Sequence, residues 1–124
     1  MPQPVILYVE NNMFLMQLVR DVLDLAGWNV QHLRSATSAR TLLRSEQPYD
    51  LLLVDNELQY MSGIELVRCA RESAHRKGLQ ILLFSIEDYE EEAKRVGADA
   101  FLRKPHDLHL LLDTIRRLLA AGGK

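Results

Sequence analysis

Short apolar runs alternate along the chain with stretches whose apolar residues recur at helical spacing. The runs VILYV (5–9) and LLLV (51–54) are wholly apolar, which is typical of strands buried on both faces of a parallel sheet. The pattern predicts five strands, at 5–9, 28–33, 50–54, 79–85 and 99–103. Apolar residues three and four positions apart predict five helices, at 13–26, 37–46, 64–75, 88–96 and 107–121.

Regular alternation of strands and helices indicates an α/β fold with a doubly wound sheet. Right-handed crossovers leave few ways to wind five such units, so we expect a flavodoxin-like five-stranded parallel sheet with strand order 2-1-3-4-5. The fourth helix is expected to be short. In the first helix, the residues expected to face the core are Leu15, Leu18, Val19, Val22, Leu23 and Ala26.

Composition limits the function classes. The chain has 124 residues, of which 48% are hydrophobic and 26% charged, and this balance fits one globular domain over about 4–121. A net charge of −2 gives no basic surface for nucleic acid, so no direct nucleic-acid binding is expected. Without a signal-peptide pattern or an apolar stretch of about 20 residues, we expect a cytoplasmic protein with no membrane contact.

Polar residues stand where three of the apolar runs end. Glu10-Asn11 follows the first predicted strand, Asp55 ends the third and Lys104 follows the fifth. The carboxyl ends of parallel strands lie at one edge of a sheet, where ligands bind, and in the expected order strands one and three are neighbours. Acids, an amide and a lysine at one edge suit a divalent cation beside a phosphoryl group.

These residues also carry a family resemblance. Beside Glu10-Asn11 and LLLVD with Asp55, the chain has Met61-Ser62-Gly63 in the following turn, Ser85 after the fourth run, GADAF with Phe101, and Lys104-Pro105. In this order and at these separations, they resemble the receiver domain of two-component response regulators over about residues 4–120.

The resemblance implies roles for the residues at this edge. Asp55 would be the phosphoacceptor, and Lys104 and Ser85 would stabilise the phosphoryl group. Ser85 and Phe101 would form the switch pair, while Gly63 and a cis Lys104–Pro105 bond would set loop geometry. The implied Mg²⁺ ligands are Glu10, Asn11, Asp55 and the backbone carbonyl of Glu57.

The resemblance also implies partners. The phosphoryl group would come from a sensor histidine kinase or a phosphotransfer protein, and the domain would catalyse at most its own phosphorylation and dephosphorylation. The face formed by the fourth helix, fifth strand and fifth helix would bind a partner or form a homodimer, with the acidic fourth helix meeting Arg116 and Arg117. No output domain is expected here, and the chain is either a stand-alone regulator or a piece of a larger one.

The chain departs from the family at the metal. Asn11 stands where the family has a second acid, so Mg²⁺ binding is expected to be weak, and the alternative is an atypical receiver, or pseudo-receiver, that binds proteins without phosphorylation. Glu57 is expected to be a solvated loop acid, although it is placed to restore charge near the metal. Bulky Ile86 is expected to narrow access to Asp55. An FMN-binding flavodoxin is set aside, because ENNMF lacks glycine and hydroxyl groups.

Overall fold

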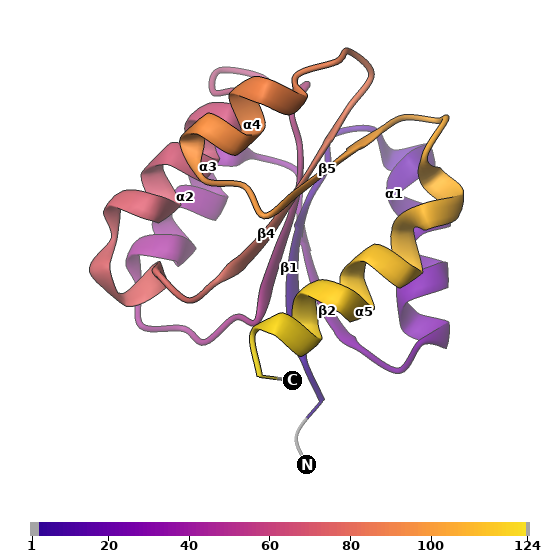
Figure 1. Ribbon diagram of the computed structural model, residues 1–124, viewed down its shortest axis with the longest axis horizontal. Coiled ribbons are helices and arrows are strands. Elements are labelled where there is room, and N and C mark those ends of the chain that lie inside the picture. Colours follow the sequence, from indigo (N-terminus) through magenta and orange to yellow (C-terminus); the bar gives the residue numbers. More distant parts are fainter. Residues whose placement is uncertain (1–2, 124) are drawn as a thin grey trace.

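The computed structural model describes residues 3–123 and contains a five-stranded parallel sheet in the order β2-β1-β3-β4-β5 (Figure 1). Both the fold class and the strand order are therefore as predicted. The strands are β1 (Val5–Val9), β2 (Asn29–Leu33), β3 (Leu51–Asp55), β4 (Gln80–Ser85) and β5 (Ala100–Arg103). The α-helices are α1 (Met13–Leu25), α2 (Ala36–Arg44), α3 (Gly63–Glu72), α4 (Glu90–Val96) and α5 (Leu111–Ala121), and the 3-10 turns are η1 (Ala74–Arg76) and η2 (Leu108–Leu110).

Helices cover both faces of the sheet. Figure 1 shows α2, α3 and α4 on one side and α1 with α5 on the other. Alternate residues of β3 pack on opposite faces of the sheet. Leu52 packs in the core under α2 and α3, and Leu53 packs in the core under α1 and α5. Both are fully buried. An apolar run that lacks alternation is thus explained by a strand with a core on each side.

Side-chain caps set where three helices begin. Asn12 accepts a hydrogen bond from the backbone N–H of Leu15 at the start of α1. Ser35 and Ser62 do the same for α2 and α3. Such caps satisfy backbone donors that have no partner within the helix. The short α4 has no such cap; it carries three acids in its first turn and ends at Gly97, whose φ of 106° favours glycine.

Two predicted helices are wrong at one end. The third was expected to reach residue 75, but α3 ends at Glu72 and η1 follows. The chain turns there because the buried Arg76 donates hydrogen bonds to the backbone carbonyls of Leu43, Ser45 and Gln47. The last helix was expected from residue 107, but η2 comes first and α5 starts at Leu111.

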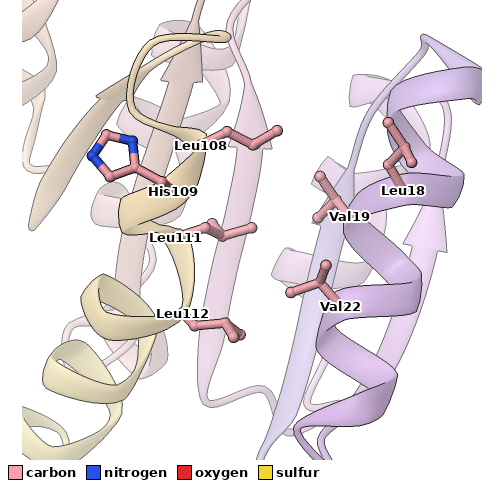
Figure 2. A pocket seen from close by; sticks show the side chains of 7 residues that line it. All are labelled: Leu18, Val19, Val22, Leu108, His109, Leu111 and Leu112. Carbon is pink, nitrogen blue, oxygen red and sulfur yellow. The ribbon is translucent and has the colours of Figure 1, made fainter.

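The predicted core face of α1 is wrong at two residues. Leu18 is 47% exposed and Val22 is 38% exposed. They line an open apolar groove of about 350 Å³ between α1 and the η2–α5 segment. Figure 2 shows Val19 and Val22 pointing across this groove toward Leu111 and Leu112. The apolar arc of α1 is therefore wider than the surface that the sheet and α5 cover. Within residues 3–123, no helix has the length and apolar character required to traverse a bilayer.

Candidate functional site

Four polar residues that the sequence places at strand ends meet at one buried site. Glu10 follows β1, Asp55 ends β3, Ser85 ends β4 and Lys104 follows β5. Exposure falls to 0% for Glu10 and Ser85, 2% for Asp55 and 7% for Lys104. Buried polar groups need partners, so these four side chains are held by one another and by nearby loops.

Lys104 is the central cation of the site. Its Nζ donates to Asp55 Oδ1 at 2.7 Å and to Glu10 Oε1 at 3.5 Å. The same Nζ lies 4.0 Å from Glu57 Oε1. An ammonium group has three donors, so one lysine serves all three carboxylates. The Lys104–Pro105 peptide bond is cis, as the resemblance implied.

Glu10 carries a carboxylate that burial makes hard to ionise. Desolvation and the charge of Asp55 raise the pKa of Glu10 to about 7, against the lowering effect of Lys104. Besides Lys104, two donors reach the carboxylate: the Tyr8 hydroxyl at 3.5 Å and the Asn12 backbone N–H at 3.2 Å. Burial, together with the nearby charge of Glu10, raises the pKa of Tyr8 far above its ordinary value. His32 Nε2 donates to the Glu10 backbone carbonyl at 2.9 Å.

The loop after Asp55 is shaped by Asn56, which the sequence analysis missed. Its side-chain Oδ1 accepts from the Ile64 N–H at 2.9 Å, and its backbone carbonyl accepts from the Gly63 N–H at 3.2 Å. Gly63 is required there, because a Cβ would lie 2.5 Å from the Asp55 carbonyl oxygen. The sequence offers only a weak indication of this role, since an asparagine directly after a strand often forms hydrogen bonds with the backbone of the next turn.

Glu57 is an exposed loop acid, as expected, but its carboxylate is also held by two hydrogen bonds that the sequence did not predict. Its Oε2 accepts a 2.6 Å hydrogen bond from the Ser85 hydroxyl, and its Oε1 accepts from the Ile86 backbone N–H at 2.9 Å. The side chain is 32% exposed. Ser85 and Ile86 offer two donors side by side, and a carboxylate has the two oxygens to accept both. Nothing in the sequence pattern shows that the loops after β3 and β4 come this close.

The remaining predicted site residues lie around this centre. Asn11 is half-buried and directly follows Glu10. Phe101 is half-buried, packs against the core under α2 and α3, and pairs with Leu83 of β4. Ile86, 55% exposed, lines a surface depression together with Lys104 and Pro105. The structure therefore gathers the predicted residues at one edge of the sheet, with Phe101 within the neighbouring β5.

The donor set at this edge fits a hard divalent cation. Burial first, and then the charge of Asp55, raise the pKa of Glu10, and Lys104 only partly offsets these two effects. A cation among them would relieve that repulsion. In the part of the chain that the structure describes, no three His, Cys, Asp or Glu side chains gather as a metal site. Neutral oxygens, such as the Asn11 amide and a backbone carbonyl, would have to complete the shell.

Comparison with known proteins agrees with this architecture. The family model of the response regulator receiver domain matches residues 6–116. The polar-differentiation response regulator DivK of Brucella anthropi is 30% identical over 122 residues, covering 96% of this chain and 98% of that protein. DivK of Brucella ovis is 29% identical over 117 residues, covering 92% and 94%.

Solved structures lead to the same family. The chemotaxis response regulator CheY4 of Vibrio cholerae superposes with a TM-score of 0.85 at 28% identity, covering 94% of this chain and 99% of that chain. A response regulator receiver protein from Pseudomonas putida gives 0.82 at 29% identity, covering 94% and 98%. With the fold, the strand-end residues and the family match in agreement, the chain belongs to the response regulator receiver domain family of two-component signalling.

Proposed function

We propose that this receiver domain accepts a phosphoryl group on Asp55 from a histidine kinase or a phosphotransfer protein. The observation that carries the proposal is the 2.7 Å contact between Asp55 Oδ1 and Lys104 Nζ at a buried strand end, with Ser85 and Ile86 donors beside it. A carboxylate in this position is a nucleophile whose product would be stabilised by a fixed cation.

The transfer is an in-line displacement at phosphorus. An Asp55 carboxylate oxygen forms a bond to phosphorus while the bond from phosphorus to the donor's histidine nitrogen breaks. The nitrogen keeps the electron pair, and because the other ring nitrogen of the donor carries a proton, the ring is left as a neutral imidazole. Lys104 holds positive charge against the phosphoryl oxygens, and burial of the site strengthens that attraction.

Mg²⁺ is the cofactor that we propose for this reaction. Glu10, Asp55, the Asn11 amide oxygen and the Glu57 backbone carbonyl would hold it. When bound, it would neutralise charge on the phosphoryl group and on Asp55. Binding is expected to be weak, because Asn11 supplies a neutral oxygen beside Glu10.

A pseudo-receiver is the second candidate function. Asn11 favours it, and so does Glu57, whose carboxylate already uses the Ser85 hydroxyl. In that case the fold would bind partners in one conformation, with no phosphoryl group.

Intact-mass measurement separates the two candidates. The protein is incubated with Mg²⁺ and a small-molecule phosphodonor such as phosphoramidate, beside an Asp55→Asn variant. Gain of one phosphoryl group by the parent alone supports phosphoacceptance on Asp55. Equal labelling of the two proteins would contradict the assignment, and no labelling of either would favour the pseudo-receiver.

We also propose that the face of α4, β5 and α5 binds a partner or a second copy. The acidic first turn of α4 supports this, since three exposed acids there exceed the one ion pair with Lys94 and would attract a basic surface. Arg116 lies 5.9 Å from the Trp28 ring and 3.6 Å from Asp113, and its side chain is 58% exposed. Its part in this face, like that of Arg117, stays a prediction. Sedimentation at low and high salt, with and without beryllofluoride, tests self-association; a monomer throughout would leave only an external partner.

A further inference from the structure

A phosphoryl group on Asp55 would need donors, and the same donors already hold a carboxylate. The Ser85 hydroxyl and the Ile86 N–H both donate to Glu57, at 2.6 Å and 2.9 Å. Lys104 Nζ lies 4.0 Å from that carboxylate and 2.7 Å from Asp55. Like a phosphoryl group, a carboxylate is an anion whose oxygens only accept.

We propose that the Glu57 side chain is an internal stand-in for the phosphoryl group, which occupies the phosphoryl-binding donors of the unphosphorylated protein and must leave before Asp55 reacts. This inference rests on the proposed phosphorylation of Asp55. It assigns to the Glu57 carboxylate a role apart from the metal, which the resemblance links to its backbone carbonyl.

The hydrogen bonds of Ser85 show why the two anions compete. Serine has one O–H donor, and Ser85 gives it to Glu57 at 2.6 Å, a length typical of a charge-assisted bond. The Ser85 oxygen in turn accepts from the Glu87 N–H at 3.1 Å. The Ser85 hydroxyl therefore already donates one hydrogen bond and accepts another. It could donate to a phosphoryl group on Asp55 only after its bond to Glu57 is broken.

The loop that carries these donors is also held from β5. Arg103 Nη2 donates to the Ile86 carbonyl at 3.1 Å, and Ser85 pairs with Arg103 in the sheet. Glu57 from one side and Arg103 from the other thus fix the loop after β4.

Glu57 is able to leave at modest cost. Its side chain is 32% exposed, so water can replace the lost hydrogen bonds. Its negative charge is the larger obstacle, because it repels an incoming phosphoryl anion until it swings out. Screening at a partly exposed position limits that repulsion, and the expected gain in phosphorylation rate on its removal is about tenfold.

The first arm of the test compares rates of Asp55 phosphorylation by phosphoramidate with saturating Mg²⁺. Glu57→Gln keeps the shape without the charge, and Glu57→Ala removes both; each is expected to react about tenfold faster than the parent. Glu72→Gln removes the same charge at the far end of α3 and is expected to match the parent. Unchanged or slower reaction of both Glu57 variants would overturn the proposal, and slower reaction would identify the carboxylate as a metal ligand instead.

The second arm needs no phosphorylation. In ¹H–¹⁵N spectra of the unphosphorylated proteins, Glu57→Ala should shift the Ile86 and Glu87 amide signals, because Ile86 loses its acceptor and Ser85 is released; Glu72→Gln should leave them in place. Coincident signals in the parent and Glu57→Ala would overturn the proposal. If no variant gains a phosphoryl group, the proposed function fails, whereas occupancy of the donors by Glu57 is still decided by these spectra.

Discussion

The two sides of Asp55 differ in their supply of carboxylates. On the β1 side, Glu10 is followed by neutral Asn11, so the proposed metal site has one acid fewer than the family resemblance implies. On the β4 side, Glu57 adds a carboxylate among the donors that a phosphoryl group would use. Negative charge is therefore lacking where it would attract a cation and present where it would repel a phosphoryl anion. Both differences would act against the proposed phosphorylation of Asp55.

Lys104 connects the two sides, and its loss should have the largest effect. Lys104→Met keeps the apolar stem but leaves Glu10 and Asp55 without their shared cation. Removal of one partner from a buried ion pair costs about 3–5 kcal/mol, so we expect a loss of this size in urea unfolding at pH 8. Arg117→Met, at an exposed position, should cost less than about 0.5 kcal/mol. Equal losses for both variants would mean that Lys104 does not hold the site together.

A pH series tests the β1 side by itself. Burial and Asp55 raise the pKa of Glu10 to about 7. A carboxyl group whose folded-state pKa is raised stabilises the fold below its unfolded pKa of about 4.5, and this stabilisation is lost as the pH rises through about 7. Without Mg²⁺, the parent should therefore lose up to roughly 3 kcal/mol relative to Glu10→Gln over this range. A difference between the two proteins that stays constant with pH would contradict the raised pKa.

Restoring the absent acid should sharpen the contrast between the two sides. Asn11→Asp places a second carboxylate beside Glu10, and calorimetry should show Mg²⁺ binding tighter by about 1–3 kcal/mol after solvent screening. Asn12→Asp is the matched control, because it adds the same charge one residue later and keeps the cap of α1. Equal Mg²⁺ affinities of Asn11→Asp and the parent would place Asn11 away from the metal.

The sequence predicted the strands and the site residues at their ends, but not the carboxylate on the β4 side of Asp55. Strands β1, β3 and β4 are apolar on both faces, so their number and order followed from composition and crossover rules. Glu10, Asp55, Ser85 and Lys104 could be predicted because each stands at a strand end, where backbone direction fixes position. Glu57 could not, because it contacts Ser85, 28 residues away, from a loop whose path depends on side chains such as Asn56.

The α1 groove was missed for a related reason. Periodicity shows which residues of a helix are apolar, but not how much of that arc its neighbours cover. Leu18 and Val22 repeat at helical spacing like Val19, which is 2% exposed, yet they stay open because the groove separates them from the η2–α5 segment. The local apolar pattern thus predicts helices and strands well, but it does not predict how closely they pack against one another.

The smallest expected effect tests the β4 side directly. A double-mutant cycle of Glu57→Ala and Ser85→Ala isolates the 2.6 Å hydrogen bond between them. Bonds to charged groups contribute about 1.5–3 kcal/mol when buried, and partial exposure of Glu57 reduces the expected coupling in urea unfolding to about 1 kcal/mol. The cycle is best run without Mg²⁺, so that only protein groups contribute. Coupling near zero would mean that Ser85 is not held by Glu57 in solution, and the two sides of Asp55 would then differ only at Asn11. Coupling of the expected size would establish that the Glu57 carboxylate binds Ser85 in the unphosphorylated protein.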